Sequence, residues 1–318
     1  MPAALVTGAA GQDGSFLVER LVADGWSVTG LVRDPSDSVP AGARTVVADL
    51  GDTERLASIV DDAEADVVFN LGALSSVAAS WTDPLATARI TGMSVAALLD
   101  AAWRRQESTG SPVRFVQASS AEVFGAATEL PQSETTPIAP VSPYGAAKAW
   151  AHSLVGVYRG RGLFASNAIL YNHESTRRPT AFVTRKITRG VAEIAAGTAE
   201  TLTLGNLDAR RDWGWAPDYV DALVLIAGAE TPDDFVVATG ESHTVAEFVE
   251  AAFAAVGITD WRAYVTSDPR FMRPSEQPEQ RGDPSKIERA LGWRRTHDFA
   301  GIVAAMVAHD LDEIRAGR

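Results

Sequence analysis

Four side chains near the middle of the sequence are suited to chemistry at a carbon that carries a hydroxyl. They are Ser120, Glu122, Tyr144 and Lys148. Tyr144 and Lys148 are four positions apart, so on a helix they share one face. A tyrosine has a pKa of about 10, too high for a base at neutral pH, but a nearby cation favours the phenolate. With Ser120 bonding the same substrate hydroxyl, the set predicts oxidation or reduction of a carbinol by hydride transfer.

Glu122 is not needed for that oxidation. A carboxylate beside a newly formed ketone can remove the acidified α-proton, which converts an oxidation into an elimination. A structural alternative is that "ASSAEVFG" (118–125) is a polar loop that closes a strand, with Lys148 an ordinary exposed helix residue.

The first 23 residues are typical of a strand, a glycine turn and a helix. A short apolar strand over Ala3–Val6 precedes Gly8, Gly11 and Gly14, and apolar residues then recur at helical spacing. Glycines allow close approach of a pyrophosphate, and the helix N-terminus directs N–H groups at its charge. Because the turn follows a strand and opens a helix, it predicts a dinucleotide site rather than a plain tight turn.

Further apolar strands alternate with helical segments, which indicates a parallel sheet with both faces covered. They are expected at 26–33, 43–50, 65–73 and 111–120. The predicted fold class is α/β, a Rossmann-type doubly wound parallel sheet with a smaller C-terminal α/β lobe. Ligands of such sheets bind beyond the C-terminal strand ends. These ends carry 7–14, Arg33, Asp49, 70–75 and 118–122.

The end of the second strand bears on the choice of cofactor. An acidic residue there holds the ribose 2′-hydroxyl of NAD, whereas an arginine holds the 2′-phosphate of NADP. Arg33 favours NADP, and the adjacent Asp34 leaves NAD open.

Composition limits the partners. The 318 residues carry a net charge of −13 and no cysteine, which argues against nucleic-acid or anionic-membrane partners and against thiol chemistry. The histidines show no metal-ligand spacing, so no metal is expected. No signal peptide or apolar run of membrane-spanning length is recognised, and a cytoplasmic location is expected.

The second half of the chain makes a resemblance specific. The sequence resembles the GDP-mannose 4,6-dehydratases, in the extended short-chain dehydrogenase/reductase superfamily, over nearly its whole length. The stretches that carry it are "TGAAGQDGSFL", "FNLGALSSV", "QASSAEVFG", "QSETTPIAPVSPYGAAKAWAH", "YRGRGLFASNAILYNHESTRRPTAFVTRKITRG", "LGNLDARRDWGWAPDYVDA", "ATGESHTVAEF" and "GDPSKIERALGW".

The resemblance implies roles for matching positions. Ser120 replaces a catalytic threonine, Glu122 matches the C5 base, and Tyr144 with Lys148 match the C4 oxidation pair. The implied cofactor positions are Gly8, Gly11, Gln12, Asp13, Gly14, Arg33, Asp49, Leu50, Leu71, Gly72, Ala73, Ser75, Tyr144, Lys148, His173 and Arg178. The implied GDP-sugar positions are Ser75, Ser120, Glu122, Asn172, Val183, Lys186, Arg211, Arg273 and Glu276.

The activity implied by the resemblance is a hydro-lyase reaction. GDP-mannose would be oxidised at C4, lose water across C5 and C6, and regain the hydride at C6 to give GDP-4-keto-6-deoxy-mannose. The alternatives are an NADP-dependent GDP-4-keto-sugar reductase or epimerase, a 4,6-dehydratase of another GDP-sugar, and a non-catalytic NADP sensor.

Departures from the family concern the assembly. The segment after Arg33-Asp34 ("DPSDSVPAGAR", 34–44) is much shorter than in the family, where it reaches a neighbouring subunit and helps to build a tetramer. A homo-oligomer is expected, with a dimer favoured over a tetramer.

Two regions are expected along the chain. Residues 1–170 form the NADP-binding domain, and 171–318 form mainly the GDP-sugar lobe, with some segments returning to the large sheet. Thr244 and Glu247 have the spacing of a helix capping box, and 298–316 is expected to be helical.

Overall fold

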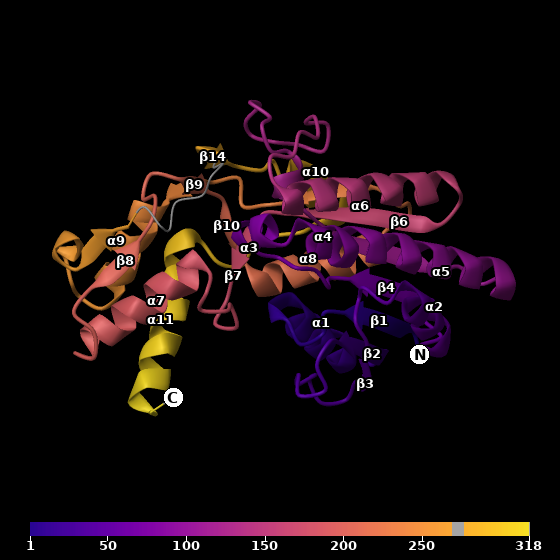
Figure 1. The fold of residues 1–318 in the computed structure, drawn as a ribbon, viewed down its shortest axis with the longest axis horizontal. Coiled ribbons are helices and arrows are strands. Elements are labelled where there is room, and N and C mark those ends of the chain that lie inside the picture. Colours follow the sequence, from indigo (N-terminus) through magenta and orange to yellow (C-terminus); the bar gives the residue numbers. More distant parts are fainter. Residues whose placement is uncertain (269–276, 318) are drawn as a thin grey trace.

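The computed structural model describes residues 1–268 and 277–317. Arg273 and Glu276, expected at the GDP-sugar site, lie outside the described residues. Figure 1 shows a larger lobe built on a parallel sheet and a smaller lobe that carries the C-terminus.

A seven-stranded sheet forms the centre of the larger lobe, in the order β11-β6-β5-β4-β1-β2-β3. Every neighbouring pair in it is parallel. Its strands are β1 (Ala3–Thr7), β2 (Ser27–Val32), β3 (Arg44–Val47), β4 (Val67–Asn70), β5 (Arg114–Ser120), β6 (Phe164–Leu170) and β11 (Asp234–Val237). The strand order reverses between β1 and β4, which places a ligand crevice beyond their carboxyl ends. The predicted fold class is confirmed.

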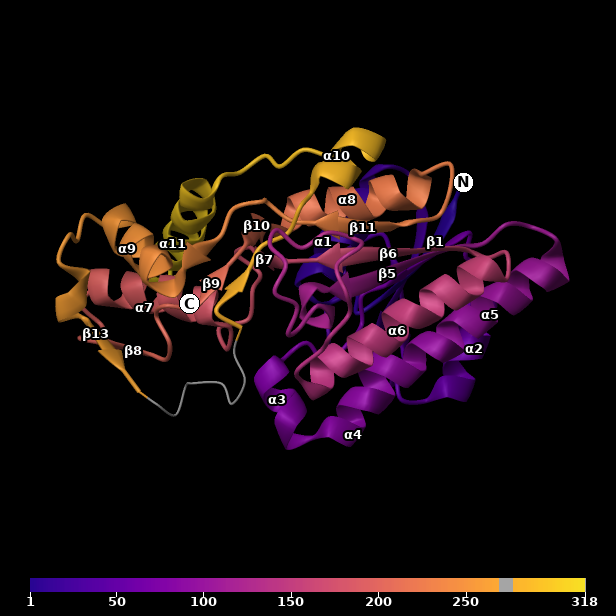
Figure 2. The same ribbon diagram turned by 90° about the horizontal axis from the view of Figure 1, so that it is seen from above.

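Helices cover both faces of this sheet because alternate strand residues point to opposite sides. On β1, Ala4 and Val6 join one core, and Leu5 joins the other. The first core contains α1 (Gln12–Ala23), α8 (Ala216–Gly228) and α10 (Ser285–Leu291). The second contains α2 (Thr53–Asp62), α5 (Ser94–Thr109) and α6 (Pro143–Gly160). Figure 2 shows α8 and α10 on the side of the sheet opposite to α5 and α6.

The smaller lobe has its own hydrophobic core. This core lies between α7 (Val183–Ala195), α9 (Val245–Ala255) and α11 (Phe299–Arg315), with aromatic packing of Trp213, Phe248 and Phe299. The capping box predicted at Thr244 and Glu247 starts α9. Short strands join the lobe: β7 (Asn172–Glu174), β8 (Leu202–Leu204), β9 (Arg210–Arg211), β10 (Trp213–Trp215), β12 (His243–Thr244), β13 (Val265–Ser267) and β14 (Glu279–Gln280).

The chain crosses between the lobes more than once. β11 pairs with β6 in the large sheet, and both α8 and α10 pack on that sheet although they follow residue 170. The later segments that pack with the large sheet are thus β11, α8 and α10. The boundary at residue 170 stays a prediction.

A long helical segment connects β4 to β5. It runs through α3 (Val77–Thr82), α4 (Pro84–Thr87), the π-helical turn η1 (Ala88–Met93) and α5. Among the described residues, 84–109 is the one helix long and apolar enough to cross a membrane, although the sequence analysis found no such run. Half of its most apolar stretch is buried. Leu98 and Leu99 lie in the second core, so this helix packs inside the larger lobe.

Candidate active site

The glycine turn between β1 and α1 leaves room for a phosphate group. Gly8 has a φ of +68°, and a Cβ on it would lie 2.9 Å from Cα of Gly72. A Cβ on Gly14 would lie 2.1 Å from the carbonyl oxygen of Gly8. Only glycine fits at these two positions, and the turn leads directly into the N-terminus of α1, which attracts anions. The residues present therefore fit a dinucleotide.

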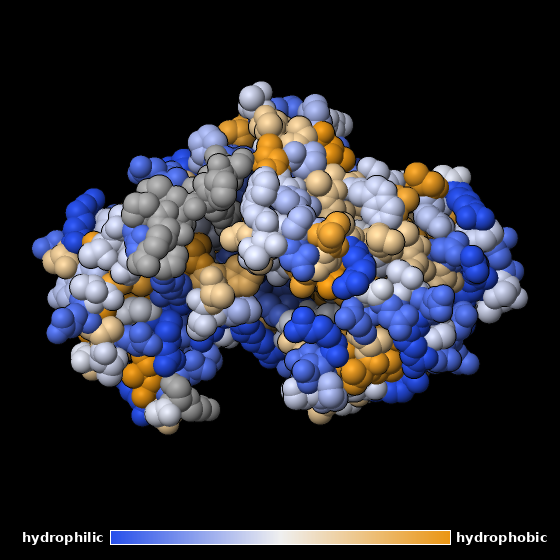
Figure 3. Space-filling model, viewed as in Figure 1, coloured by the Kyte–Doolittle hydropathy of each residue, from blue (hydrophilic) through white to orange (hydrophobic). Residues whose placement is uncertain are grey.

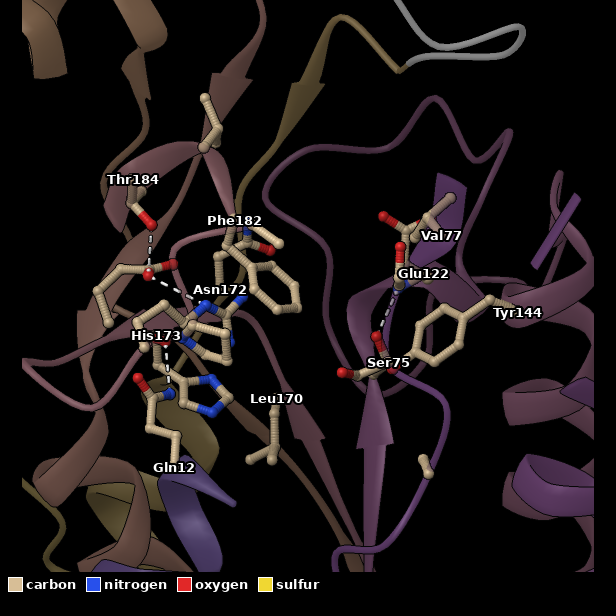
Figure 4. A pocket seen from close by; sticks show the side chains of 18 of the residues that line it. Gln12, Ser75, Val77, Glu122, Tyr144, Leu170, Asn172, His173, Phe182 and Thr184 are labelled. Atoms are coloured by element: carbon tan, nitrogen blue, oxygen red, sulfur yellow. Dashed lines mark hydrogen bonds and ion pairs between the residues drawn. The ribbon is translucent and has the colours of Figure 1, made fainter. Parts of the chain in front are cut away.

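Polar side chains connect the start of α1 to β7. His173 donates from Nδ1 to the carbonyl oxygen of Tyr171 at 2.6 Å, so its Nε2 faces Asp13 at 2.8 Å. Gln12 donates to the carbonyl oxygen of His173 at 3.1 Å and accepts from the hydroxyl of Ser175 at 2.8 Å. Figure 4 shows Gln12 and His173 side by side on one wall of the cavity. The turn and β7 therefore form one rigid wall.

Tyr144 and Lys148 lie on α6, where they share one face as the spacing predicts. The Lys148 ammonium donates to the carbonyl oxygen of Ala118 at 2.7 Å and lies 5.8 Å from the centre of the Tyr144 ring. Burial lowers the pKa of Lys148 to about 8, with the charge of Asp13 opposing this change. Both side chains are more than nine-tenths buried.

The pKa of Tyr144 differs from the expectation that Lys148 favours the phenolate. Burial raises the pKa of Tyr144 to about 12, and the charge of Glu122 adds to this, while the hydrogen bond with Ser120 and the charge of Arg178 oppose it. Burial of the phenol therefore outweighs the opposing charge of Arg178, and a base role for Tyr144 needs further positive charge beside its ring.

Glu122 lies in the short helical turn η2 (Ala121–Val123), directly after β5. Its backbone N–H donates to the hydroxyl oxygen of Ser120 at 3.3 Å. Figure 4 shows Glu122, Ser75 and Tyr144 on the cavity wall opposite Asn172 and His173. The carboxylate accepts a hydrogen bond from the side-chain amide of Gln280 at 3.3 Å.

The other wall comes from the smaller lobe. Glu174 accepts a hydrogen bond from Thr184 at 2.6 Å and pairs with Arg178 at 3.2 Å, although Nε of Arg178 makes no hydrogen bond of good geometry. Arg178 also lies over the ring of Phe182 at 3.8 Å. A partly buried guanidinium with remaining donor capacity at the edge of the cavity suits a phosphate.

These walls line one cavity of about 860 Å³, which is in the upper part of the size range of ligand sites in proteins. Figure 3 shows the surface hollowed between the two lobes. The predicted site residues that line the cavity are Gly8, Gly11, Gln12, Asp13, Gly14, Leu71, Gly72, Ala73, Ser75, Ser120, Glu122, Tyr144, Lys148, Asn172, His173, Arg178, Val183 and Lys186.

Other predicted residues do not line the cavity. Arg33 and Asp49 are exposed beyond β2 and β3, and Leu50 lies behind Gly72. Arg211 is buried and donates to the carbonyl oxygens of Arg210 and Gln277. Their roles stay predictions.

The sequence analysis missed several residues at the cavity. Trp81, Phe182, Thr184 and Asn206 line it, and Gln280 contacts Glu122. Phe182 and Thr184 flank Val183, which the sequence analysis placed at the site. Their position next to Val183 could have predicted that they line the cavity. Gln280 lies in a two-residue strand, β14, and no motif marks it.

A doubly wound parallel sheet with a glycine turn, and a Ser–Tyr–Lys set facing one cavity, define an NAD(P)-dependent enzyme of the short-chain dehydrogenase/reductase type. The GDP-mannose 4,6 dehydratase family profile matches residues 5–306. A GDP-mannose 4,6 dehydratase of Arabidopsis thaliana is 44% identical, covering 97% of this chain and 87% of the relative. The chain therefore belongs to the GDP-mannose 4,6-dehydratase family.

Solved structures agree on the fold. A UDP-glucose 4-epimerase of Thermus thermophilus in complex with NAD is 27% identical with a TM-score of 0.84, covering 96% of this chain and 98% of that chain. RMD of Pseudomonas aeruginosa complexed with NADPH is 22% identical with a TM-score of 0.81, covering 98% and 99%. The fold is thus an NAD(P)-binding one.

Proposed function

We propose that this enzyme converts GDP-mannose to GDP-4-keto-6-deoxy-mannose and water. The observation that carries the proposal is the placement of Glu122 on the same cavity as Ser120, Tyr144 and Lys148 in a chain of this family. Oxidation or reduction of a carbinol needs the hydroxyl and ammonium groups, and elimination needs in addition a base for the C5 proton. An acid at this position does not by itself exclude a reductase or epimerase, so the family match supports the choice between them.

Each residue has a defined task in this reaction. Tyr144 accepts the proton of the C4 hydroxyl, which Ser120 orients through a hydrogen bond. Lys148, fixed by the carbonyl of Ala118, supplies a positive charge near the phenolate. A bound nicotinamide supplies the hydride acceptor for C4 and later the hydride donor for C6. Glu122 removes the C5 proton and passes it to the C6 hydroxyl, which departs as water. The proton that Tyr144 took from the C4 hydroxyl balances the one that C5 takes up when the hydride reaches C6.

We also propose NADP as the cofactor. The carboxylate of Asp34 accepts hydrogen bonds from the backbone N–H of Ser36 at 2.8 Å and from its hydroxyl at 2.6 Å. These bonds hold the carboxylate of Asp34 against the backbone of the loop that follows it. Arg33 is then the residue at the end of β2 that suits a 2′-phosphate.

A dimer in the cytoplasm is the proposed state of the enzyme. Large apolar side chains are exposed along α3, α4, η1 and α6, namely Trp81, Leu85, Met93, Trp150 and Val157. A second copy that packs its own helices there would cover them. Light scattering after gel filtration is expected to give twice the chain mass for the wild type and one chain mass for Trp150→Glu. Leu225→Glu on α8 is the matched control, and a monomeric wild type would contradict the proposal.

A product assay tests the activity. GDP-mannose with catalytic NADP is expected to yield a 4-keto-6-deoxy sugar by NMR, with no net NADPH. A GDP-4-keto sugar reduced at the expense of NADPH, with GDP-mannose unchanged, would favour the reductase instead.

A further inference from the structure

Gln280 holds the carboxylate of Glu122 from the other lobe. Nε2 of Gln280 lies 3.3 Å from Oε1 of Glu122, across 158 positions of sequence. Gln280 is 2% exposed, so its amide is shielded from water. A hydrogen bond from a neutral donor to a carboxylate is stronger than one between neutral groups, and shielding strengthens it further.

The backbone around Gln280 is fixed on both sides. The N–H of Asp212 donates to the carbonyl oxygen of Gln280 at 3.0 Å. The N–H of Gln132 donates to the carbonyl oxygen of Arg281 at 2.8 Å, and that of Asp283 to the carbonyl oxygen of Gln132 at 2.8 Å. The segment 280–283 is therefore held between β9 of the small lobe and the 126–139 loop of the large lobe.

The carboxylate of Asp212 adds a second restraint. It accepts hydrogen bonds from the backbone N–H groups of Thr239, Gly240 and Gly282. A Cβ on Gly282 would lie 2.5 Å from Cβ of Ala238, so the segment also packs closely against its neighbours. A side chain on such a backbone is preorganised, which is what a positioning residue requires.

Locally, the backbone N–H of Glu122 donates to the hydroxyl oxygen of Ser120. This bond fixes the peptide and leaves the carboxylate to rotate. We propose that Gln280 is a positioning residue for the C5 base: it holds Oε1 of Glu122 and leaves the other oxygen to take the proton. This role rests on the proposed function.

The test separates the two halves of the reaction. Gln280→Met keeps the length of the side chain and removes the donor. With GDP-mannose and NADP, release of the keto-deoxy product is expected to slow at least tenfold, while NADPH formation in a single turnover and KM change less than twofold. Arg281→Met, next to it and paired with the partly buried Glu279, is the control with no expected change. Equal slowing of both steps, or none, would overturn the proposal.

A second variant excludes a merely structural role. In Gln280→Glu the new carboxyl can donate to Glu122 only while protonated, because two adjacent carboxylates share one proton. Near pH 5.5 the rate of elimination by Gln280→Glu is expected to exceed that of Gln280→Met. Near pH 8 the two rates are expected to be equal. Equal rates of the two variants at both pH values would contradict the assignment.

A further measurement does not depend on the substrate. In the wild-type background, Gln280→Met is expected to lower the midpoint of urea unfolding. In the Glu122→Leu background the same change is expected to leave the midpoint unchanged, because the Gln280–Glu122 hydrogen bond is already absent. An equal shift in both backgrounds would show that the two side chains are not coupled. A wild type that forms no product with GDP-mannose would contradict the proposed function while this coupling remained measurable.

Discussion

Oδ2 of Asp13 and Nε2 of His173 lie 2.8 Å apart, although 160 positions separate the two residues in the sequence. Burial alone would raise the pKa of Asp13 and lower that of His173. Their mutual attraction and hydrogen bond reverse both effects, so the pKa of Asp13 is lowered and that of His173 is raised. The contact that ties α1 to β7 is therefore a charged pair.

Asp13→Asn is expected to destabilise the ligand-free protein by about 3 kcal/mol at pH 6, because it leaves a buried charge without its partner. The raised pKa of His173 gives stability that is full below its unfolded value of 6.5 and lost as pH rises through the folded pKa. The lowered pKa of Asp13 gives stability that is full above 3.8 and lost on acidification. The loss of unfolding free energy caused by Asp13→Asn should thus be largest between pH 3.8 and pH 6.5 and smaller at pH 9, as measured by urea unfolding.

The matched control is Glu19→Gln on the same helix. Glu19 pairs with Arg177 at 2.9 Å, with both side chains more than a third exposed, so this change should cost less than about 1 kcal/mol. A cost of Asp13→Asn that is the same at pH 6 and pH 9 would show that the Asp13–His173 contact is not a charged pair.

Lys148→Met is expected to abolish product formation and yet stabilise the ligand-free fold at pH 7. Burial lowers the pKa of Lys148 from 10.5 to about 8, so the charged form is held at a cost of roughly 3 kcal/mol. Loss of its bond to the carbonyl of Ala118 offsets about 1 kcal/mol of the gain. Between pH 8 and 10.5 the unfolded chain binds more protons, so the wild type gains stability and the difference should shrink.

Urea unfolding of both proteins at pH 7 and pH 10 checks this prediction, together with the product assay at pH 7. A Lys148→Met variant less stable than the wild type at pH 7 would contradict the prediction. It would mean that the contacts of the Lys148 ammonium outweigh the cost of its burial.

Local patterns in the sequence predicted much of the fold. The glycine turn at Gly8–Gly14 and the Tyr144–Lys148 spacing depend on neighbours a few positions away, and both lie where expected. The contacts of Asp13 with His173 and of Gln280 with Glu122 join distant segments, and no periodicity encodes them. The direction of the Tyr144 pKa could not be predicted either, because it depends on how completely the cavity excludes water around the phenol.

Glu122→Gln is expected to slow formation of the keto-deoxy product by about 10²–10⁴-fold, the usual contribution of a general base. C4 oxidation should continue, because Ser120, Tyr144 and Lys148 remain. Single-turnover measurement of NADPH absorbance alongside NMR of the product separates the two steps. Glu129→Gln, an exposed carboxylate in the neighbouring loop, is the control. Product formed at the wild-type rate would remove Glu122 from its role.

Arg33→Ala is expected to weaken NADP binding by about 10–100-fold and NAD binding by less than twofold, since a hydrogen bond to a charged group contributes about 1.5–3 kcal/mol. Asp34→Asn removes a negative charge beside the same phosphate and should strengthen NADP binding severalfold. Calorimetric titration with both cofactors measures this. Equal losses for NADP and NAD in Arg33→Ala would place the 2′-phosphate elsewhere.

The central claim is that one hydride leaves C4 and returns to C6 of the same sugar while Glu122 drives the loss of water between these steps. The most direct test is to incubate the enzyme with GDP-mannose deuterated at C4, with catalytic NADP, and to follow the label by NMR. Deuterium at C6 of a 4-keto product, with no net reduced cofactor, is the predicted result. Deuterium that accumulates in stoichiometric reduced cofactor, with the C6 hydroxyl still present, would contradict it.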